Sequence, residues 1–394
     1  MINSNQPNVV ADSECEPVTH STRNASALID RTTEQPVIEH IATDQALTVE
    51  QMQQSVCWDW QKVTANTVND INTFALLIGV DRQALASLVE ENHFTLRVPL
   101  PFVSRMRTGD LSDPLLLQVL PLKQEQQHVS GNSTDPLDEK RYNVCPGLIH
   151  KYRGRVLLTA ATSCPINCRY CFRRHFDYEN NRLTPSTWNQ ALNYIRNDDT
   201  ITEVILSGGE PLLLNDRMIS RLLDEIESVA HVLHIRIHSR YPIVVPQRLT
   251  NALCSRLISS RCNIAMVLHC NHPNEIDKHV AQHLQRLANS RVTLLNQSVL
   301  LRNINDDSDT LSSLSETLYR AGVLPYYLHA TDAVVGTVHY QVSDARAQQL
   351  SLELTHRLPG YLVPTLVREV SGKNAKTRLP LDNSNNSVMP NCRE

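Results

Sequence analysis

The chain contains 394 residues, of which 41% are hydrophobic and 20% are charged, and its formal net charge is -4. This balance is typical of a folded globular protein and gives no reason to expect a nucleic-acid partner. No basic start followed by an apolar run opens the sequence, so we expect neither a secretory signal nor a membrane span. We therefore expect the ten cysteines to be reduced thiols in the cytoplasm.

Composition divides the chain into four segments. Residues 1–45 are rich in Ser, Thr, Asn, Glu and Gln without an apolar period, which predicts a disordered extension. Residues 46–145 combine helical spacing with proline-punctuated apolar runs, which predicts a mostly helical region that packs on the segment C-terminal to it. Residues 146–370 predict an α/β domain, and residues 371–394 are a short lysine-bearing segment and a polar tail.

Apolar strands alternate with amphipathic helical segments from Val156 onward, which favours a parallel α/β sheet. The expected strands span 156–162, 203–209, 231–239, 263–271, 292–301 and 324–332. Six such units are fewer than the eight of a closed barrel, so an incomplete barrel and a doubly wound sheet both fit. In a barrel the chemistry lies at the C-terminal ends of the strands, where the polar motifs of this chain fall.

A run of three cysteines, "TSCPINCRYCFRRHF", follows the first expected strand. Cys164, Cys168 and Cys171 lie among polar and proline neighbours, which argues against their being small core hydrophobes. A closed zinc site needs four ligands, and the sequence has no second pair at zinc-finger spacing. A loop of three thiolates that holds a four-iron cluster would leave one iron open for another ligand, an asymmetry that suits catalysis.

"CPINCRYC" resembles the Cys-x3-Cys-x2-Cys motif of the radical S-adenosylmethionine (SAM) superfamily. In that superfamily the open iron of a [4Fe-4S] cluster binds the amino and carboxylate groups of SAM. "SGGEPLLL" resembles the glycine-rich strand end that contacts the methionine part of SAM, which implies roles for Gly208, Gly209 and Glu210. On residue types alone, this segment also fits an ordinary strand-to-helix turn.

Residues 58–379 resemble the lysine 2,3-aminomutase family, in blocks such as "NHPNEI", "NQSVLLRNIND", "PYYLHATD" and "GYLVPTLVRE". The resemblance implies a partial (β/α)6 TIM-like barrel and conversion of (S)-α-lysine to (R)-β-lysine. It also implies pyridoxal 5′-phosphate (PLP) as a further cofactor. SAM cleavage would supply a radical that removes a hydrogen from the β-carbon before the nitrogen migrates. "YYLHATDAVVGTVHY", with His329, looks most like the bacterial branch that supplies β-lysine for elongation factor P.

The resemblance assigns residues to PLP. Aligning the Lys-Thr pair of "SGKNAKTRL" makes Lys376 the lysine that binds PLP covalently, with Lys373 as the rival. Arg155 and Lys151 would hold the PLP phosphate. A lysine in this role needs its charge suppressed by burial or by cationic neighbours.

The resemblance also assigns residues to SAM and to the substrate. Arg173 would bind the substrate carboxylate, for which a planar bidentate donor is apt. Asp332 would receive the distal ammonium of lysine, and Glu369 stands where the family has a second aspartate. His269 and Gln297 match residues near SAM.

Three alternatives remain at this point. An aminomutase for another amino acid such as glutamate would need a cation where Asp332 stands. A radical SAM enzyme without PLP, or an iron–sulfur or zinc-binding interaction module, would not use Lys376. Beyond the substrate lysine, the resemblance implies an electron donor such as flavodoxin or ferredoxin and a ligase that acts on elongation factor P. A homo-oligomer is compatible with it, and neither nucleic acid nor a membrane is expected.

Overall fold

The computed structural model describes residues 47–90, 94–127 and 129–380. The extension expected at residues 1–45 and the end of the polar tail lie outside these ranges. The described residues all belong to one compact unit. None of their helices is long and apolar enough to cross a bilayer.

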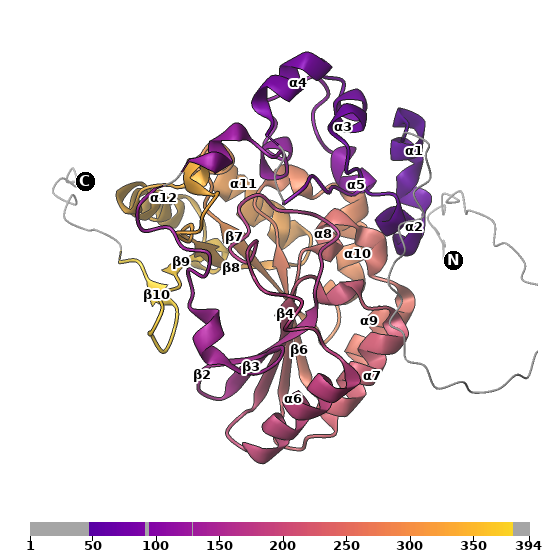
Figure 1. Ribbon diagram of the computed structural model, residues 1–394, viewed down its shortest axis with the longest axis vertical. Helices are drawn as coiled ribbons and strands as arrows, with labels where there is room; N and C mark the ends of the chain where they lie inside the picture. The colour runs from indigo at the N-terminus through magenta and orange to yellow at the C-terminus, as the bar shows by residue number, and fades with distance from the viewer. Residues whose placement is uncertain (1–46, 91–93, 128, 381–394) are drawn as a thin grey trace, which may run out of the picture. The chain divides into compact units, whose positions relative to one another are not determined.

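One sheet organises the described residues (Figure 1). Its ten strands follow one another in chain order, and the consecutive pairs from β3–β4 to β8–β9 are parallel. The pairs β1–β2, β2–β3 and β9–β10 are antiparallel. The strands are β1 (Asn143–Cys145), β2 (Leu148–Tyr152), β3 (Arg155–Ala161), β4 (Glu203–Gly208), β5 (His234–Ser239), β6 (Asn263–His269), β7 (Thr293–Val299), β8 (Leu324–His329), β9 (Thr365–Arg368) and β10 (Thr377–Arg378).

Helices connect the parallel strands. They are α6 (Pro185–Asn197), α7 (Asp216–Glu227), α8 (Tyr241–Val244), α9 (Asn251–Ile258), α10 (Lys278–Ala288), α11 (Ser308–Arg320) and α12 (Asp344–Arg357). The longer ones begin at a side chain that caps the first turn, such as Thr184 before α6 and Asp307 before α11. Their buried apolar residues, such as Leu223 of α7, share a core with strand residues such as Ile235.

The two faces of the parallel strands differ in character. Val156 and Leu158 represent the fully buried apolar face, which packs in the same core as the helices. The alternate residues include His238, His269 and Gln297, which are polar and only partly buried. Because side chains alternate along a strand, these residues share the opposite face. That polar face is the interior on which a site can be built.

The predicted parallel α/β fold is confirmed, and the strand order decides between the two sheets left open. A doubly wound sheet reverses its order at a switch point, whereas these strands run in chain order as in a barrel. The six expected strands are present with ends shifted by up to three residues. The sheet is larger than expected, since β9 adds a seventh parallel strand and β1, β2 and β10 add antiparallel edges. β9 has only four residues, too few to show an alternating pattern.

Short helices and turns precede the sheet. The helices are α1 (Val49–Gln54), α2 (Trp60–Ala65), α3 (Ile71–Ile78), α4 (Arg82–Leu88), α5 (Leu100–Val103), and the 3₁₀ helices η1 (Ser55–Cys57), η2 (Leu116–Gln118), η3 (Lys123–Gln126) and η4 (Glu139–Tyr142). Phe74 and Leu85 lie in the same core as strand residues such as Val204. η3 and η4 carry the buried acids Glu125 and Glu139, which face the loop after β3.

Two glycines join the end of β4 to that loop. Gly208 has a φ of 100°, and a Cβ on it would lie 2.5 Å from Cγ2 of Thr159. A Cβ on Gly209 would lie 2.6 Å from the carbonyl oxygen of Ser163 and 2.8 Å from its nitrogen. Backbone atoms cannot swing aside as side-chain ends can, so only glycine allows this approach. The close contact fixes the chain immediately before Cys164.

We expect Gly209→Ala to destabilise the protein by about 1–3 kcal/mol, because a methyl group is forced into a packed site. Denaturant unfolding measures this change, and the iron content after reconstitution should fall with it. Gly360→Ala is the matched control, since nothing lies within 4 Å of its Cβ position. Equal stability of the two variants would contradict the close approach.

Candidate active site

The loop between β3 and α6 carries the three cysteines. Cys164, Cys168 and Cys171 are half-buried free thiols. Burial and the neighbouring cysteines raise the pKa of Cys164, and burial together with Cys168 raises the pKa of Cys171 to about 11. Each of these two thiols thus lies within electrostatic reach of its neighbouring cysteines. This donor set fits an iron–sulfur cluster held by three thiolates.

Arg240, immediately after β5, contacts this loop. Its Nη1 donates to Sγ of Cys168 at 2.7 Å and to the hydroxyl of Tyr170. Its Nη2 donates to Oε1 of Gln118 at 2.7 Å and to Oε2 of Glu275 at 3.1 Å. Glu275 is fully buried, so the charge of Arg240 is compensated inside the protein. Arg240 therefore ties the cysteine loop to the buried carboxylate of Glu275.

The block "NHPNEI" forms the turn that presents Glu275. The backbone N–H groups of Asn271 and His272 donate to Oε1 of Glu275 at 2.9 and 3.1 Å. The side chain of Asn271 donates to Oε1 of Gln118 at 3.0 Å. These contacts connect the end of β6 with Arg240 and through it with the cysteine loop. The block therefore has a structural role beside the cluster site.

Two glutamates of the N-terminal region hold three arginines of the cysteine run. Glu125 accepts from Nε of Arg169 at 2.6 Å and from Nη2 of Arg174 at 2.6 Å. Glu139 accepts from Nε and Nη2 of Arg173 at 2.8 and 2.5 Å. The five side chains are at most 9% exposed. Charge-assisted pairs of this kind fix geometry, so the N-terminal region sets the shape of the loop.

The glycine-rich strand end places Glu210 inside the protein. Its carboxylate accepts from Oγ of Ser239 at 2.6 Å and from the backbone N–H groups of Arg240 and Tyr241 at 3.0 and 3.1 Å. It also accepts from the backbone N–H of Leu212 at 3.1 Å. Burial raises the pKa of Glu210 to about 7 against the effect of these bonds. Glu210 therefore ties the end of β4 to the end of β5.

His269 and Gln297 are register partners on β6 and β7. The ring of His269 is stacked on Tyr170 with the ring centres 5.6 Å apart, and its Nε2 lies 3.0 Å from the hydroxyl of Tyr170. Burial and the charge of Arg240 lower the pKa of His269 well below its ordinary value. The imidazole is thus neutral and is oriented by the cysteine loop.

A hairpin at the other edge of the sheet brings Lys376 opposite Glu369. β9 and β10 are antiparallel, and Thr377 is the register partner of Arg368. Nζ of Lys376 consequently lies 2.7 Å from Oε2 of Glu369. It also lies 5.9 Å from the ring centre of Tyr327, a residue of β8. The hairpin therefore directs this lysine toward the interior.

Glu369 is shared by two lysines and a tyrosine. Besides Lys376, its carboxylate contacts Nζ of Lys151 at 3.0 Å and the hydroxyl of Tyr152 at 2.8 Å. Burial opposes ionisation, but the two lysines lower the pKa of Glu369 below its ordinary range. Lys373 is exposed to solvent, whereas Lys376 is partly buried. The structure thus brings Lys376, and not Lys373, to the interior residues.

Further titratable groups line the same interior. Burial and the charge of Glu369 raise the pKa of Asp332 to about 7. Burial and Lys376 lower the pKa of His329 to about 3. Burial and nearby cations also lower the pKa of His238, whose Nε2 is buried without a hydrogen-bond partner among the described residues. An orphaned imidazole nitrogen beside cations fits a ligand that brings an anionic or carbonyl oxygen.

Arg155 begins β3, at the opposite end of that strand from the cysteines. Its guanidinium lies 4.6 Å from the ring centre of Tyr152. Lys151 is on the neighbouring strand β2 and contacts Glu369. The two residues expected to hold a phosphate are therefore near the hairpin that carries Lys376.

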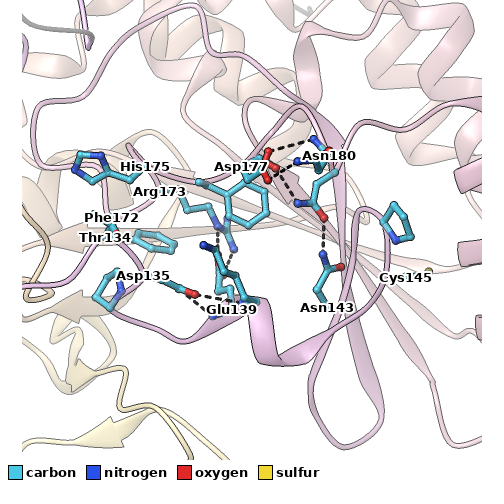
Figure 2. Close-up of a pocket in the computed structure, with 15 residues that line it drawn as sticks. Thr134, Asp135, Glu139, Asn143, Cys145, Phe172, Arg173, His175, Asp177 and Asn180 are labelled. Carbon is cyan, nitrogen blue, oxygen red and sulfur yellow. Dashed lines mark hydrogen bonds and ion pairs between the residues drawn. The ribbon is translucent and has the colours of Figure 1, made fainter.

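A pocket of about 420 Å³ opens beside Arg173 and Glu139 (Figure 2). Phe172 and Phe176 supply part of its apolar lining, and Figure 2 shows Arg173 and Glu139 pointing toward each other. Nη1 of Arg173 also donates to Oγ of Ser207 on β4 at 3.2 Å. The guanidinium thus extends from the wall of this pocket to the polar face of the sheet.

The predicted residues fall into two groups. The group that follows or ends strands on the cysteine side contains Cys164, Cys168, Cys171, Arg173, Gly208, Gly209, Glu210, His269 and Gln297. The group around the hairpin contains Lys151, Arg155, Asp332, Glu369 and Lys376. Both groups act on His238, because Lys376 of one group and Arg173 of the other lower its pKa in addition to burial.

Sequence reasoning missed the partners that fix this site. Glu125 and Glu139 lie in the short 3₁₀ helices η3 and η4, Arg240 directly follows β5, and Glu275 ends the 3₁₀ helix η7 (Pro273–Glu275). Each acts through contacts distant in sequence, and no local spacing marks such pairs. Across the described ranges, no three Cys, His, Asp or Glu side chains converge on one metal-ion position. In a four-iron cluster each thiolate binds a separate iron, so the cysteines need not converge.

Comparison with known proteins gives consistent matches. Residues 153–247 match the family of 4Fe-4S single cluster domains. The L-lysine 2,3-aminomutase of Escherichia coli K12 is 45% identical over 325 residues, which cover 82% of this chain and 95% of that protein. The L-lysine 2,3-aminomutase of Haemophilus influenzae is 43% identical over a match that covers 81% of this chain and 95% of that protein. The L-lysine 2,3-aminomutase of Clostridium subterminale is 32% identical over a match that covers 85% of this chain and 78% of that protein.

We expect Glu125→Gln to destabilise the protein by roughly 3–5 kcal/mol, because it leaves two buried arginines without their shared anion. Denaturant unfolding measures the loss, and the iron bound after reconstitution should fall in parallel. The exposed Glu179, in the same loop, gives the matched control Glu179→Gln. If both variants unfold at the same denaturant concentration, Glu125 does not fix the loop.

Proposed function

The chain belongs to the family of L-lysine 2,3-aminomutases, and we propose that it converts (S)-α-lysine to (R)-β-lysine. It is an isomerase that uses a [4Fe-4S] cluster, SAM and PLP. The observation that carries the proposed reaction is the meeting of the two residue groups on one polar interior. The cysteine loop supplies the cluster end of this interior, and Lys376 with Glu369 supplies the other.

Bound SAM and the reduced cluster supply a radical that removes hydrogen, and bound PLP supplies a conjugated system through which the nitrogen can move. The residues of the chain bind and orient these groups. Cys164, Cys168 and Cys171 hold the cluster. Gly208, Gly209, Glu210, His269 and Gln297 hold or frame SAM, while Lys376 binds PLP and Lys151 and Arg155 hold its phosphate.

Arg173, Asp332 and Glu369 select the substrate. Arg173 binds the carboxylate, and the two acids receive the distal ammonium. Lys376 and Lys151 both contact Glu369 in this structure. Lys376 would bind PLP covalently, and Glu369 together with Asp332 would receive the distal ammonium of the substrate. A substrate with a distal carboxylate would instead meet two acids in a buried site, which is costly.

The product has a proposed use in the cytoplasm. Blocks such as "YYLHATDAVVGTVHY" resemble the branch of the family that supplies β-lysine for elongation factor P. We therefore infer that a lysyl ligase consumes the β-lysine and that flavodoxin or ferredoxin reduces the cluster. The eight described cysteines are free thiols, which suits a reducing compartment. A homo-oligomer is compatible with these roles.

The test of the reaction is anaerobic reconstitution with iron, sulfide and PLP, followed by incubation with SAM, reductant and (S)-α-lysine. We expect (R)-β-lysine by mass spectrometry. Lys376→Ala should abolish both the product and the visible absorbance of covalently bound PLP, because in this proposal Nζ of Lys376 forms the covalent bond and the neighbouring Lys151 holds the phosphate.

Lys373→Ala is the matched control, because Lys373 is exposed and lies in the same hairpin. It should retain the absorbance and the product. Loss of covalent PLP in Lys373→Ala alone would move the cofactor lysine to residue 373. A protein that carries both cluster and PLP yet forms no β-lysine would overturn the proposed reaction.

Asp332 makes lysine binding depend on pH. Its pKa of about 7 means that it is increasingly protonated as the pH falls below 7 in the substrate-free protein. Only the ionised carboxylate attracts the ammonium of lysine, so kcat/KM for lysine should fall about tenfold per pH unit below about pH 7. Asp332→Asn should remove this acidic limb and lower kcat/KM throughout. An unchanged limb in that variant would assign the titration to another group.

A further inference from the structure

The hydrogen bonds of Arg173 leave one edge of its guanidinium available. Arginine has five N–H groups. Glu139 takes the side formed by Nε and Nη2 with distances of 2.8 and 2.5 Å, and Ser207 takes one hydrogen of Nη1 at 3.2 Å. Among the described residues these three contacts use three of the five groups. One of the remaining hydrogens lies on Nη1 and the other on Nη2, the two nitrogens of the end edge of the fork.

That edge is on the side of the sheet interior. Ser207 belongs to β4 and is the register partner of Thr159 on β3, so its side chain lies on the polar face of the strands. The charge of Arg173 acts on His238 of β5, which lies on the same face. Glu139 belongs to η4 and lines the 420 Å³ pocket, with its carboxylate facing Arg173 (Figure 2).

Glu139 is itself held in place. Its backbone N–H donates to Oδ1 of Asp135 at 2.9 Å, and that of Lys140 donates to Oδ2 at 3.3 Å. The Asp138 residue before it has a φ of 54°, a left-handed turn that starts η4. The carboxylate therefore projects from a fixed turn rather than from a flexible connector.

We propose that Glu139 and Ser207 are positioning residues, which hold Arg173 so that its end edge faces the substrate carboxylate. The inference deepens the proposed lysine reaction and rests on it, because it assumes that Arg173 binds that carboxylate. A planar guanidinium gives bidentate binding only when it is oriented in advance, and the long arginine side chain has several rotamers. Glu139 fixes the rotation of the guanidinium plane, and Ser207 fixes the end that points inward.

A competing physical effect would change KM for lysine in the opposite direction when the charge of Glu139 is removed. Glu139 is an anion close to the substrate carboxylate, so it also repels that group and offsets part of the charge of Arg173. If repulsion or competition for Arg173 were the main effect, removing the charge would tighten lysine binding. If positioning is the main effect, removing it weakens lysine binding. The direction of the change in KM therefore separates the two roles.

The test uses the reconstituted full-length enzyme with lysine and with lysinamide, which lacks the carboxylate charge. We expect Glu139→Gln to raise KM for lysine roughly 10- to 100-fold, with a smaller change in kcat, because misaligned binding groups cost this much. KM for lysinamide should change little, so the preference for lysine should fall. Ser207→Ala should act in the same direction, and Glu139→Asp should restore part of the preference.

Thermal unfolding and iron content show whether each variant is folded and loaded, with Glu179→Gln as the exposed control from the cysteine loop. If Glu139→Gln does not fold, Ser207→Ala carries the comparison alone. A lower KM for lysine in Glu139→Gln, or equal changes for lysine and lysinamide, overturns the positioning role. Arg173→Lys tests the premise separately. If the wild-type enzyme does not prefer lysine over lysinamide, and Arg173→Lys changes KM for neither compound, then Arg173 does not bind the substrate carboxylate.

Discussion

One carboxylate group fixes the segment on which the chemistry depends. Glu125 pairs with both Arg169 and Arg174, which lie on either side of Cys171, and the three side chains are at most 2% exposed. A buried arginine without a partner is costly, so the cysteine loop takes this shape only when η3 is in place. The N-terminal region therefore sets the shape of the cysteine loop.

Charge is compensated differently at the two ends of the interior. Near the cysteines the cation Arg240 is shared between the Cys168 sulfur and the buried acid Glu275. Near the hairpin Glu369 is balanced by two lysines, while burial and the charge of Glu369 raise the pKa of Asp332 to about 7. Under the proposed function, the distal ammonium of the substrate would bring positive charge to these two acids.

The fold was largely predictable because short-range patterns in the sequence indicate most of its strands and helices. Alternation and helical spacing locate six of the strands, and the Cys-x3-Cys-x2-Cys spacing locates the cluster loop. The four-residue strand β9 was not found, since it is too short to show a period. The roles of Glu125, Glu139 and Arg240 were not found either, because their contacts join segments far apart in sequence. For Lys376 against Lys373, only the register of the β9–β10 hairpin separates an inward lysine from an exposed one.

That hairpin also has a consequence for the order of events during synthesis. The cysteine loop and its partners Glu125 and Glu139 precede β4 in the chain, whereas Lys376 can reach Glu369 only after β9 and β10 have paired. A nascent chain therefore contains the three cysteines of the loop well before Lys376 can reach Glu369. Under the proposed function, covalent capture of PLP at Lys376 would report that β9 and β10 have paired, and a chain arrested earlier would carry no coenzyme to react with a radical.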